Sequence, residues 1–267
     1  MKQLLLKLQL IITLVLLVLM FSCTQQAAKE QQVLTSLSKD IKEIHEGILE
    51  GYLSKEEVPN SLKLVPPPPE EGSAAFMLDQ EMAANYVALE DDARKEQAAK
   101  DAVLSFPEAI DAFNIVLDVK ISEENTPHLY MVLRRTLADA GLSTYAAKNH
   151  YQRKRPFMVN NKPTCTPDEE VVLRKDGSYP SGHTAIGWAW ALILSEVFPD
   201  QADVILERGK QFGISRNVCN VHWHSDVVNG RMMGAAAVAA LHANADFLID
   251  IDAAKTEILK LKESINY

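Results

Sequence analysis

The chain has 267 residues, 47% of them hydrophobic, which is enough for one large domain with a sizeable core. Its formal net charge is −9 at pH 7, and an acidic protein of this kind does not bind nucleic acid through general electrostatic attraction. Aromatic residues make up only 7% of the chain, while alanine and leucine are abundant, which favours helices packed on helices. We therefore expect an all-α protein without a nucleic-acid partner.

The first 22 residues have the pattern of an export signal. Two lysines precede an apolar run over 10–21, and Cys23 follows shortly after it. Because this run is too short to cross a bilayer as a permanent helix, we predict a signal peptide over 1–22 and an exported, periplasmic protein. Cys23 leaves two alternatives open. The signal is cleaved nearby, or the protein is an outer-membrane lipoprotein whose one membrane attachment is lipid on Cys23.

We predict that residues 23–61 form a polar spacer in front of the main domain. From Gln25 to about Tyr52 the apolar residues recur near helical spacing, which indicates one amphipathic helix. A run of four prolines over 66–69 then requires an extended segment, because proline lacks an amide hydrogen and restricts the residue before it. We place the start of the main domain near Leu62, so that it covers 62–267.

Helical patterns fill most of this main domain. They run over 74–104, 107–119, 128–140, 184–198, 200–212, 226–250 and 253–264, with a short helix around Lys148. The stretch 157–179 has the asparagine, proline and glycine content of a long loop. The run Gly-Ala-Ala-Ala-Val-Ala-Ala over 234–240 has little side-chain bulk, so a neighbouring helix can approach it closely. We expect this run in the central helix of a bundle, and small apolar helix faces are also compatible with a homo-oligomer.

Three short polar clusters interrupt the helical patterns. They are Lys148-x6-Arg155-Pro156, Pro180-Ser181-Gly182-His183 and Ser215-Arg216-x5-His222-x3-Asp226. Together they contain one lysine and two arginines that can hold a small anion, hydroxyl and amide donors, and two histidines that can act as nucleophile and acid. The combination predicts an enzyme that acts on phosphate esters.

The second cluster leads directly into a helical pattern, so it is expected at a helix N-terminus. Free amides at such an end attract anions, and Gly182 lets a phosphate approach the backbone closely. The alternative is that Ser181 is an ordinary helix cap and His183 is incidental. In the third cluster His222 and Asp226 are four residues apart, so the carboxylate can fix the imidazole tautomer, although such a pair alone is usually an ordinary surface pair.

The remaining cysteines form an even pair in an exported chain. Cys165 and Cys219 can form one disulfide in an oxidising compartment, or remain as two buried thiols. A bridge would close a loop of about 55 residues and contribute about 3 to 4 kcal/mol to stability in the chain-entropy model.

The three clusters, in this order and at these spacings, resemble the signature of the type 2 phosphatidic acid phosphatase and vanadium haloperoxidase superfamily. Within it, the segments 64–72 and 177–188 and the pair Cys165 and Cys219 look like those of the exported bacterial class A non-specific acid phosphatases. The resemblance covers residues 64 to 247. It implies an all-helical bundle and hydrolysis of soluble small-molecule phosphate monoesters through a phosphohistidine, with no metal and no cofactor, and it allows phosphotransfer to an alcohol.

The resemblance also implies a role for each matching residue. His222 would be the nucleophile, Asp226 its orienting partner and His183 the acid that protonates the leaving oxygen. The groups that would bind the phosphoryl oxygens are Lys148, Arg155, Ser181, Gly182 and Arg216. Phosphoryl transfer depends mainly on positioning and on cations around the equatorial oxygens, so three fixed cations can take the place of a metal.

Two other enzymatic functions fit parts of the pattern. His222, His224 and Asp226 have the spacing that begins an H-x-H-x-D zinc site, which would make the protein a zinc hydrolase, although residue 227 is valine and the cationic residues stay unexplained. A vanadate-dependent haloperoxidase would use the same clusters with vanadate in place of phosphate. A surface lipoprotein that only binds phosphate compounds would lack at least one of the chemical residues, and none is missing.

Overall fold

The computed structural model describes residue 37 and residues 40–265. Residues from Ile41 onward form one compact unit. Within the described residues the protein is built of helices with one two-stranded sheet, so the all-α prediction is confirmed. The predicted signal peptide over 1–22 and Cys23 lie outside the described residues, as does half of the predicted amphipathic helix.

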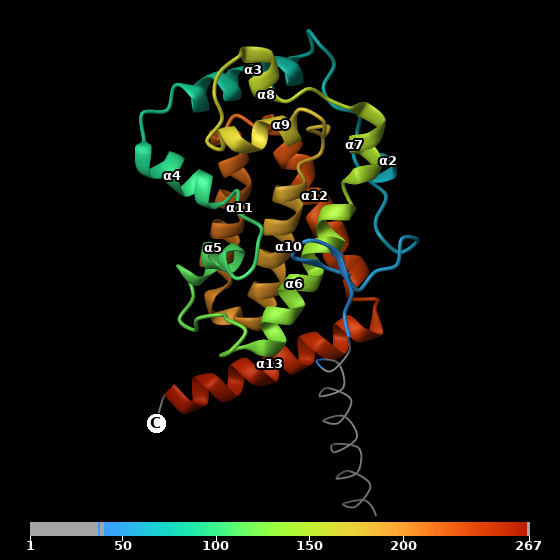
Figure 1. The fold of residues 1–267 in the computed structure, drawn as a ribbon, viewed down its shortest axis with the longest axis vertical. Coiled ribbons are helices and arrows are strands. Elements are labelled where there is room, and N and C mark those ends of the chain that lie inside the picture. Colours follow the sequence, from blue (N-terminus) through green and yellow to red (C-terminus); the bar gives the residue numbers. More distant parts are fainter. Residues whose placement is uncertain (1–36, 38–39, 266–267) are drawn as a thin grey trace, which may run out of the picture. The chain divides into compact units, whose positions relative to one another are not determined.

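Four long helices run side by side and position everything else (Figure 1). They are α6 (Pro127–Leu142), α10 (Gly182–Val197), α11 (Ala202–Val218) and α12 (His224–Leu241). Helix α10 packs against each of the other three, and α13 (Ala245–Ile265) crosses one end of the group and packs mainly on α6. The central helix is therefore α10, with α12 as one of its main neighbours.

Small residues bring α12 close to α10. A Cβ atom on Gly230 would lie 2.6 Å from the carbonyl oxygen of Ser181, and one on Gly234 would overlap the carbonyl oxygen of Ala185. Real side-chain atoms do not approach backbone so closely, so these positions accept only glycine at this helix separation. The close approach predicted for the run over 234–240 is confirmed at its first residue.

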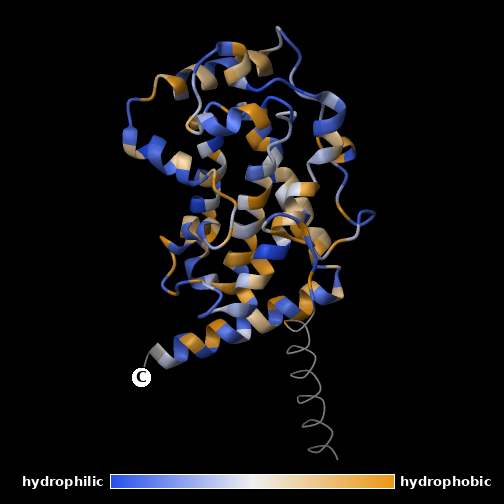
Figure 2. Ribbon diagram, viewed as in Figure 1, coloured by the Kyte–Doolittle hydropathy of each residue, from blue (hydrophilic) through white to orange (hydrophobic). Residues whose placement is uncertain are grey.

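The main core surrounds Trp190 of α10. Its side chain is fully buried, and its indole Nε1 donates a hydrogen bond to the carbonyl oxygen of Leu133 in α6 at 3.0 Å. Phe106 and Phe113 meet the indole edge-on, with ring centroids 5.7 and 6.3 Å away, an arrangement that adds to the gain from burying aromatic surface. Hydrophilic and hydrophobic residues alternate along α13 (Figure 2), whose apolar positions join this core.

Shorter elements cover the sides of the bundle and the end that lies opposite α13. They are α2 (Ser61–Leu64), α3 (Ala74–Val87), α4 (Asp92–Lys100), α5 (Asp111–Asn114), α7 (Tyr145–Tyr151), α8 (Pro156–Asn160), α9 (Glu170–Leu173) and the 3-10 turns Glu108–Ile110, Pro167–Glu169 and Pro199–Gln201. The predicted helix over 107–119 is thus only a turn and one short helix. The predicted loop over 157–179 contains most of α8, one turn and α9.

Two predicted long helices are broken by side chains that cap a new helix. Asp91 separates α3 from α4 by accepting a hydrogen bond from the amide of Arg94 at 2.9 Å. Asn244 does the same between α12 and α13, through the amide of Phe247 at 3.1 Å. Such caps satisfy amides that have no intrahelical partner, so they favour a new start over continuation. Among the described residues no single helix is long and apolar enough to span a membrane, and α12 with α13 meets that test only as a pair bent by 95°.

The predicted spacer is wrong for its described part, because residues 41–61 belong to the compact unit. β1 (Glu43–His45) and β2 (Ile48–Leu49) form an antiparallel hairpin, and Gly47 between them has a φ of 75°, which suits glycine. Tyr52 is buried, and its amide donates to Asp139 Oδ2 of α6 at 2.9 Å. The boundary of the main domain therefore lies near Ile41, and not near Leu62.

Candidate active site

The three polar clusters meet at one pocket of about 440 Å³. The lining residues from the three clusters are Lys148, Arg155, Gly182, His183 and His222, and Asp176 joins them. Three further predicted residues, Ser181, Arg216 and Asp226, are fully buried and lie behind this lining, not in it. Asp226 contacts the His222 ring at 3.3 Å, the Ser181 amide donates to the carbonyl oxygen of Asp226 at 3.0 Å, and the His222 amide donates to that of Arg216 at 3.2 Å.

The second cluster forms the N-terminus of α10, as predicted. Ser181 is the N-cap, and its Oγ accepts a hydrogen bond from the amide of Thr184 at 3.3 Å. The first intrahelical hydrogen bond runs from the amide of Ala185 to the carbonyl oxygen of Ser181 at 3.1 Å, so the amides of Gly182 and His183 precede it. Amides in these positions attract anions. Ser181 therefore is a helix cap, as the alternative interpretation expected. Its side chain caps the Thr184 amide, so the amides of Gly182 and His183 remain available for an anion.

His222, just before α12, is held in one tautomer. Oδ2 of Asp226 accepts hydrogen bonds from His222 Nδ1 at 3.3 Å and from the amide of Trp223 at 2.8 Å. The other ring nitrogen, Nε2, lies 3.0 Å from Arg155 Nη1, which is a donor only. Burial and the neighbouring charge of Arg155 hold the pKa of His222 well below its usual range. The ring is therefore neutral, with its proton on Nδ1 and a lone pair on Nε2.

Asp226 is itself held by Arg153, which Asp79 holds in turn, and neither residue belongs to the sequence motifs. Oδ1 of Asp226 accepts a hydrogen bond from Arg153 Nη1 at 2.6 Å, and Arg153 Nη2 lies 2.7 Å from Oδ2 of Asp79 in α3. Burial raises the pKa of Asp226 to about 6, and the charge of Arg153 opposes that rise. In the sequence Arg153 is only one of four cations between 148 and 155, and nothing there marks Asp79.

Asp176 joins the two cations of the first cluster. Its Oδ2 lies 3.1 Å from Lys148 Nζ and 3.0 Å from Arg155 Nη2, so one carboxylate oxygen bridges both. Burial and the charge of Arg155 lower the pKa of Lys148 to about 8. Sequence reasoning missed this residue, and the signal that could have found it is an acidic side chain directly before the Gly177–His183 block.

Arg216, at the end of α11, is a buried cation without a hydrogen-bonded partner. None of its side-chain surface is exposed, and within the described part of the chain its Nε, Nη1 and Nη2 make no hydrogen bond. Burial lowers the pKa of its guanidinium to about 10. An unpaired buried charge is costly, and such groups normally have an anion beside them. An anion from outside the chain would offset the charge of Arg216.

His183 lies next to this cation and is oriented by the backbone. Its Nε2 lies 2.9 Å from the carbonyl oxygen of Ala102, which only accepts hydrogen bonds, so Nε2 carries the proton. Burial and the charge of Arg216 hold the pKa of His183 well below its usual range, while the Ala102 carbonyl opposes this shift. A bound anion that offsets the cations would make protonation of Nδ1 easier.

Comparison with known proteins places this geometry in a family. The model of the PAP2 superfamily matches residues 129–249, a span that contains all three clusters. The non-specific acid phosphatase of Providencia stuartii is 45% identical over 213 residues, which are 79% of this chain and 86% of that protein. The chain belongs to the PAP2 superfamily.

Further relatives agree with this assignment. The non-specific acid phosphatase of Salmonella typhimurium is 39% identical over 219 residues, 82% of this chain and 85% of its own. The acid phosphatase of Zymomonas mobilis is 39% identical over 198 residues, which are 74% of this chain and 75% of that protein. The resemblance to the bacterial class A non-specific acid phosphatases is therefore confirmed.

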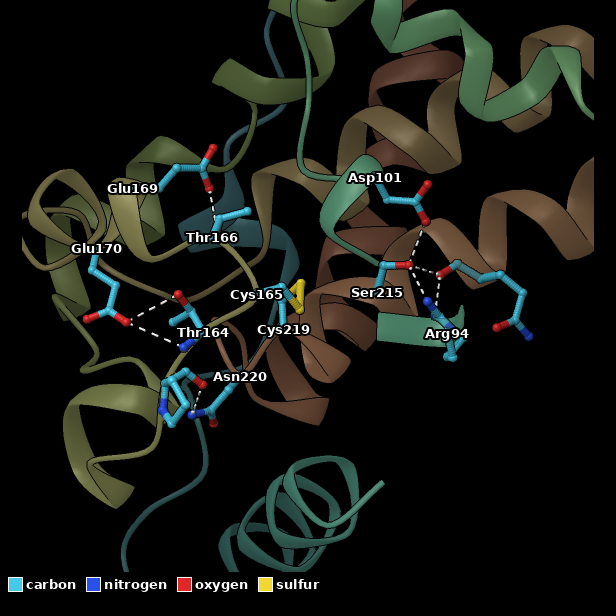
Figure 3. The surroundings of a disulfide bond; sticks show 12 residues. Arg94, Asp101, Thr164, Cys165, Thr166, Glu169, Glu170, Ser215, Cys219 and Asn220 are labelled. Carbon is cyan, nitrogen blue, oxygen red and sulfur yellow. Dashed lines mark hydrogen bonds between the residues drawn. A yellow bond between two sulfur atoms is a disulfide. The ribbon is translucent and has the colours of Figure 1, made fainter. Parts of the chain in front are cut away.

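A disulfide supports the PAP2 site from outside the pocket (Figure 3). Cys165 and Cys219 are bonded, with their Cα atoms 4.7 Å apart and a sequence separation of 54. Ser215, in the last turn of α11, donates a hydrogen bond to Asp101 Oδ2 at 2.6 Å, and Figure 3 shows this pair near the disulfide. The bridge thus fastens the loop that precedes α9 to the end of the helix that carries Arg216.

His224 begins α12 and is not part of the pocket lining. In the zinc interpretation it would act with His222 and Asp226, but those two contact each other, and Nε2 of His222 faces a guanidinium. Among the described residues, no three histidine, cysteine or acidic side chains are arranged to hold a metal ion. The geometry therefore gives the zinc interpretation no support.

Proposed function

We propose that this chain, a phosphoric monoester hydrolase like the acid phosphatases it is related to, hydrolyses soluble phosphate monoesters through a phosphohistidine on His222. One observation carries the proposal: the lone pair of His222 Nε2 lies at a pocket lined by Lys148 and Arg155. Behind that lining is Arg216, a buried cation that makes no side-chain hydrogen bond within the described residues. A phosphoryl group offers oxygens to those cations and an electrophile to that nitrogen.

In the first half of the reaction, His222 Nε2 attacks phosphorus and the bond to the ester oxygen breaks. Lys148, Arg155 and Arg216, with Ser181 and the amide of Gly182, stabilise the charge on the phosphoryl oxygens. Asp226 accepts the Nδ1 hydrogen bond and stabilises the positive charge that develops on the ring. Protonated His183 gives its proton to the leaving oxygen, so that the alcohol departs neutral.

In the second half, water attacks the phosphorus of the phosphohistidine and the P–N bond breaks. His183, now neutral, accepts a proton from the water, which restores both histidines and releases inorganic phosphate. An alcohol in place of water would receive the phosphoryl group instead, which is the phosphotransfer that we also propose. Phosphate in the pocket offsets the charges that lower the pKa of His183, so acid solution and bound substrate both favour its working form.

The test uses p-nitrophenyl phosphate with His222→Ala, His183→Ala and, as a matched control, the exposed His150→Ala. We expect the first variant to lose turnover and the second to accumulate a phosphohistidine with this good leaving group, while the control keeps parent activity. Turnover retained in His222→Ala would refute the nucleophile assignment. Loss of activity in EDTA, with recovery on adding zinc, would favour the zinc hydrolase, and peroxide-dependent bromide oxidation with vanadate would favour the haloperoxidase.

We further propose that the protein works outside the cytoplasm, on the strength of the pattern in residues 1–22. Mass spectrometry of the mature N-terminus distinguishes simple cleavage from lipid on Cys23. A chain that retains Met1 in cell fractions would contradict export.

A further inference from the structure

The pocket that holds the phosphate-binding cations is much larger than a phosphate group needs. At about 440 Å³ it falls within the range of pockets that bury a whole small molecule. The part not formed by the three clusters and Asp176 comes from the hairpin, α6 and neighbouring residues, and it includes Ile44, Ile48, Leu104, Leu142, Tyr145 and Ile186. Apart from the phosphate-site groups, only His45 and Tyr145 bring polar side-chain atoms to the lining.

Several of these apolar side chains are exposed to an unusual degree for their size. Ile44 of the hairpin is 50% exposed, Leu142 at the end of α6 is 48% exposed and Tyr145 at the start of α7 is 45% exposed. All three line the same pocket. An apolar patch that gathers around a pocket commonly marks where a ligand covers it. Here the ligand's position is fixed from one side, because its phosphate must reach His222.

We infer that this wall binds the organic part of the substrate, and that the preferred substrates are phosphate monoesters of uncharged aromatic alcohols; the inference rests on the proposed function. A flat apolar ring covers Ile44, Leu142 and Tyr145 without leaving its own polar groups unpaired. The hydroxyls of a sugar phosphate would lose water there and find few partners. A second phosphate would meet no cation beyond those that already hold the first.

The hairpin gives this wall its specificity. Ile44 and Ile48 come from a segment that is tied to the bundle at Tyr52 and Leu53, whose amides both donate to Asp139 at 2.9 Å. A leaving group therefore meets a fixed surface. The specificity-determining residues are then Ile44 of the hairpin and Leu142 of α6.

Non-hydrolysable inhibitors test the inference apart from the chemistry. We expect phenylphosphonate to inhibit the parent at least about tenfold more strongly than methylphosphonate. In Ile44→Ser and Leu142→Ser the inhibition constant for phenylphosphonate should rise about three- to tenfold, while that for methylphosphonate stays unchanged. Val172→Ser is the matched control, because Val172 is 69% exposed and lies outside the pocket.

Two outcomes would overturn the inference. The parent binds both phosphonates equally, or the phenyl preference survives in the double variant Ile44→Ser/Leu142→Ser. Neither outcome depends on turnover, so a result that refutes the apolar binding wall is distinct from one that refutes the phosphohistidine mechanism. If Leu142→Ser unfolds, Ile44→Ser decides alone, because Ile44 lies in the hairpin and not in a helix of the bundle.

Discussion

Replacing Arg216 with methionine should make the free protein more stable and the enzyme much less active. The guanidinium is fully buried and its three nitrogens have no hydrogen-bond partner in the described part of the chain. Burial lowers its pKa from the ordinary value to about 10, a drop that corresponds to about 3 kcal/mol at roughly 1.4 kcal/mol per pH unit. Below pH 10 the group is charged in both folded and unfolded chains, so this cost is present throughout the neutral and acid range.

Methionine fills a similar volume without a charge, and such replacements are neutral or stabilise by about 1 to 4 kcal/mol. We therefore expect the free energy of unfolding of Arg216→Met, measured in urea without phosphate, to exceed that of the parent by about 1 to 3 kcal/mol. Inorganic phosphate at one hundred times its dissociation constant should stabilise the parent by about 2.7 kcal/mol, and the variant much less at the same concentration. Turnover should fall by about 10² to 10³, the usual effect of removing one group that stabilises the transition state.

Arg135→Met is the matched control. Arg135 is also buried, but its Nη2 donates to the carbonyl oxygen of Gly51 at 2.8 Å and its guanidinium lies 3.7 Å from the centre of the Tyr52 ring. This variant should lose stability, by about 1 to 3 kcal/mol, because it leaves buried acceptors without a donor. If Arg216→Met is less stable than the parent without phosphate, or if phosphate stabilises both proteins equally, the reasoning about Arg216 is refuted.

Three further changes test other parts of the molecule. Asp176→Asn should strengthen inhibition by inorganic phosphate about tenfold, because the Asp176 carboxylate would no longer compete with phosphate for Lys148 and Arg155. If the variant loses turnover but does not bind phosphate more tightly, Asp176 is instead a positioning residue. Burial raises the pKa of Asp139 and of Asp226 to about 6. Between about pH 4 and pH 6 these two carboxyl groups therefore hold protons in the folded protein that the unfolded chain has released. The free energy of unfolding should accordingly fall as pH rises from about 4 to about 6. Urea unfolding across this range checks it, and in Asp139→Asn the fall should be smaller. Reduction of the bond between Cys165 and Cys219 should lower the free energy of unfolding by about 3 to 4 kcal/mol, and an unchanged value would refute that contribution.

The predicted site residues come together because their positions are set by local rules. Ser181 precedes a strongly helical pattern, so it caps α10 and brings the amides of Gly182 and His183 to its end. His222 and Asp226 lie on either side of a helix start, which turns the carboxylate back toward the ring. Spacing along the chain was enough for these contacts.

The residues that sequence reasoning missed act across long separations. Asp79 contacts Arg153 and Ser225, which lie 74 and 146 residues further along the chain. No local pattern marks an aspartate in α3 as the partner of an arginine before α8, because the pairing is created only when the helices pack.

The hairpin was missed for a different reason. Ile44 and Ile48 are four residues apart, a spacing that fits one face of a helix as well as the two arms of a tight hairpin. The hairpin is favoured over the helix by Gly47 at the turn and by the hydrogen bond from Tyr52 to the buried Asp139. The glycine can be read from the sequence, whereas the contact with Asp139 forms only in the folded protein. The two helix breaks also had signals in the sequence, because Asp91 and Asn244 are good helix caps. The prediction missed them because it relied on hydrophobic periodicity, which continues across both positions.

The glycines that bring α12 against α10 also bear on how such an enzyme can diversify. Gly230 and Gly234 lock the helix that follows His222 to the helix that begins with Gly182, so almost any substitution there would shift one set of reacting groups relative to the other. Ile44, by contrast, stands on a hairpin outside that contact, and its change leaves the helix spacing untouched. Natural variation in substrate preference can therefore accumulate in the hairpin while the chemistry is inherited unaltered.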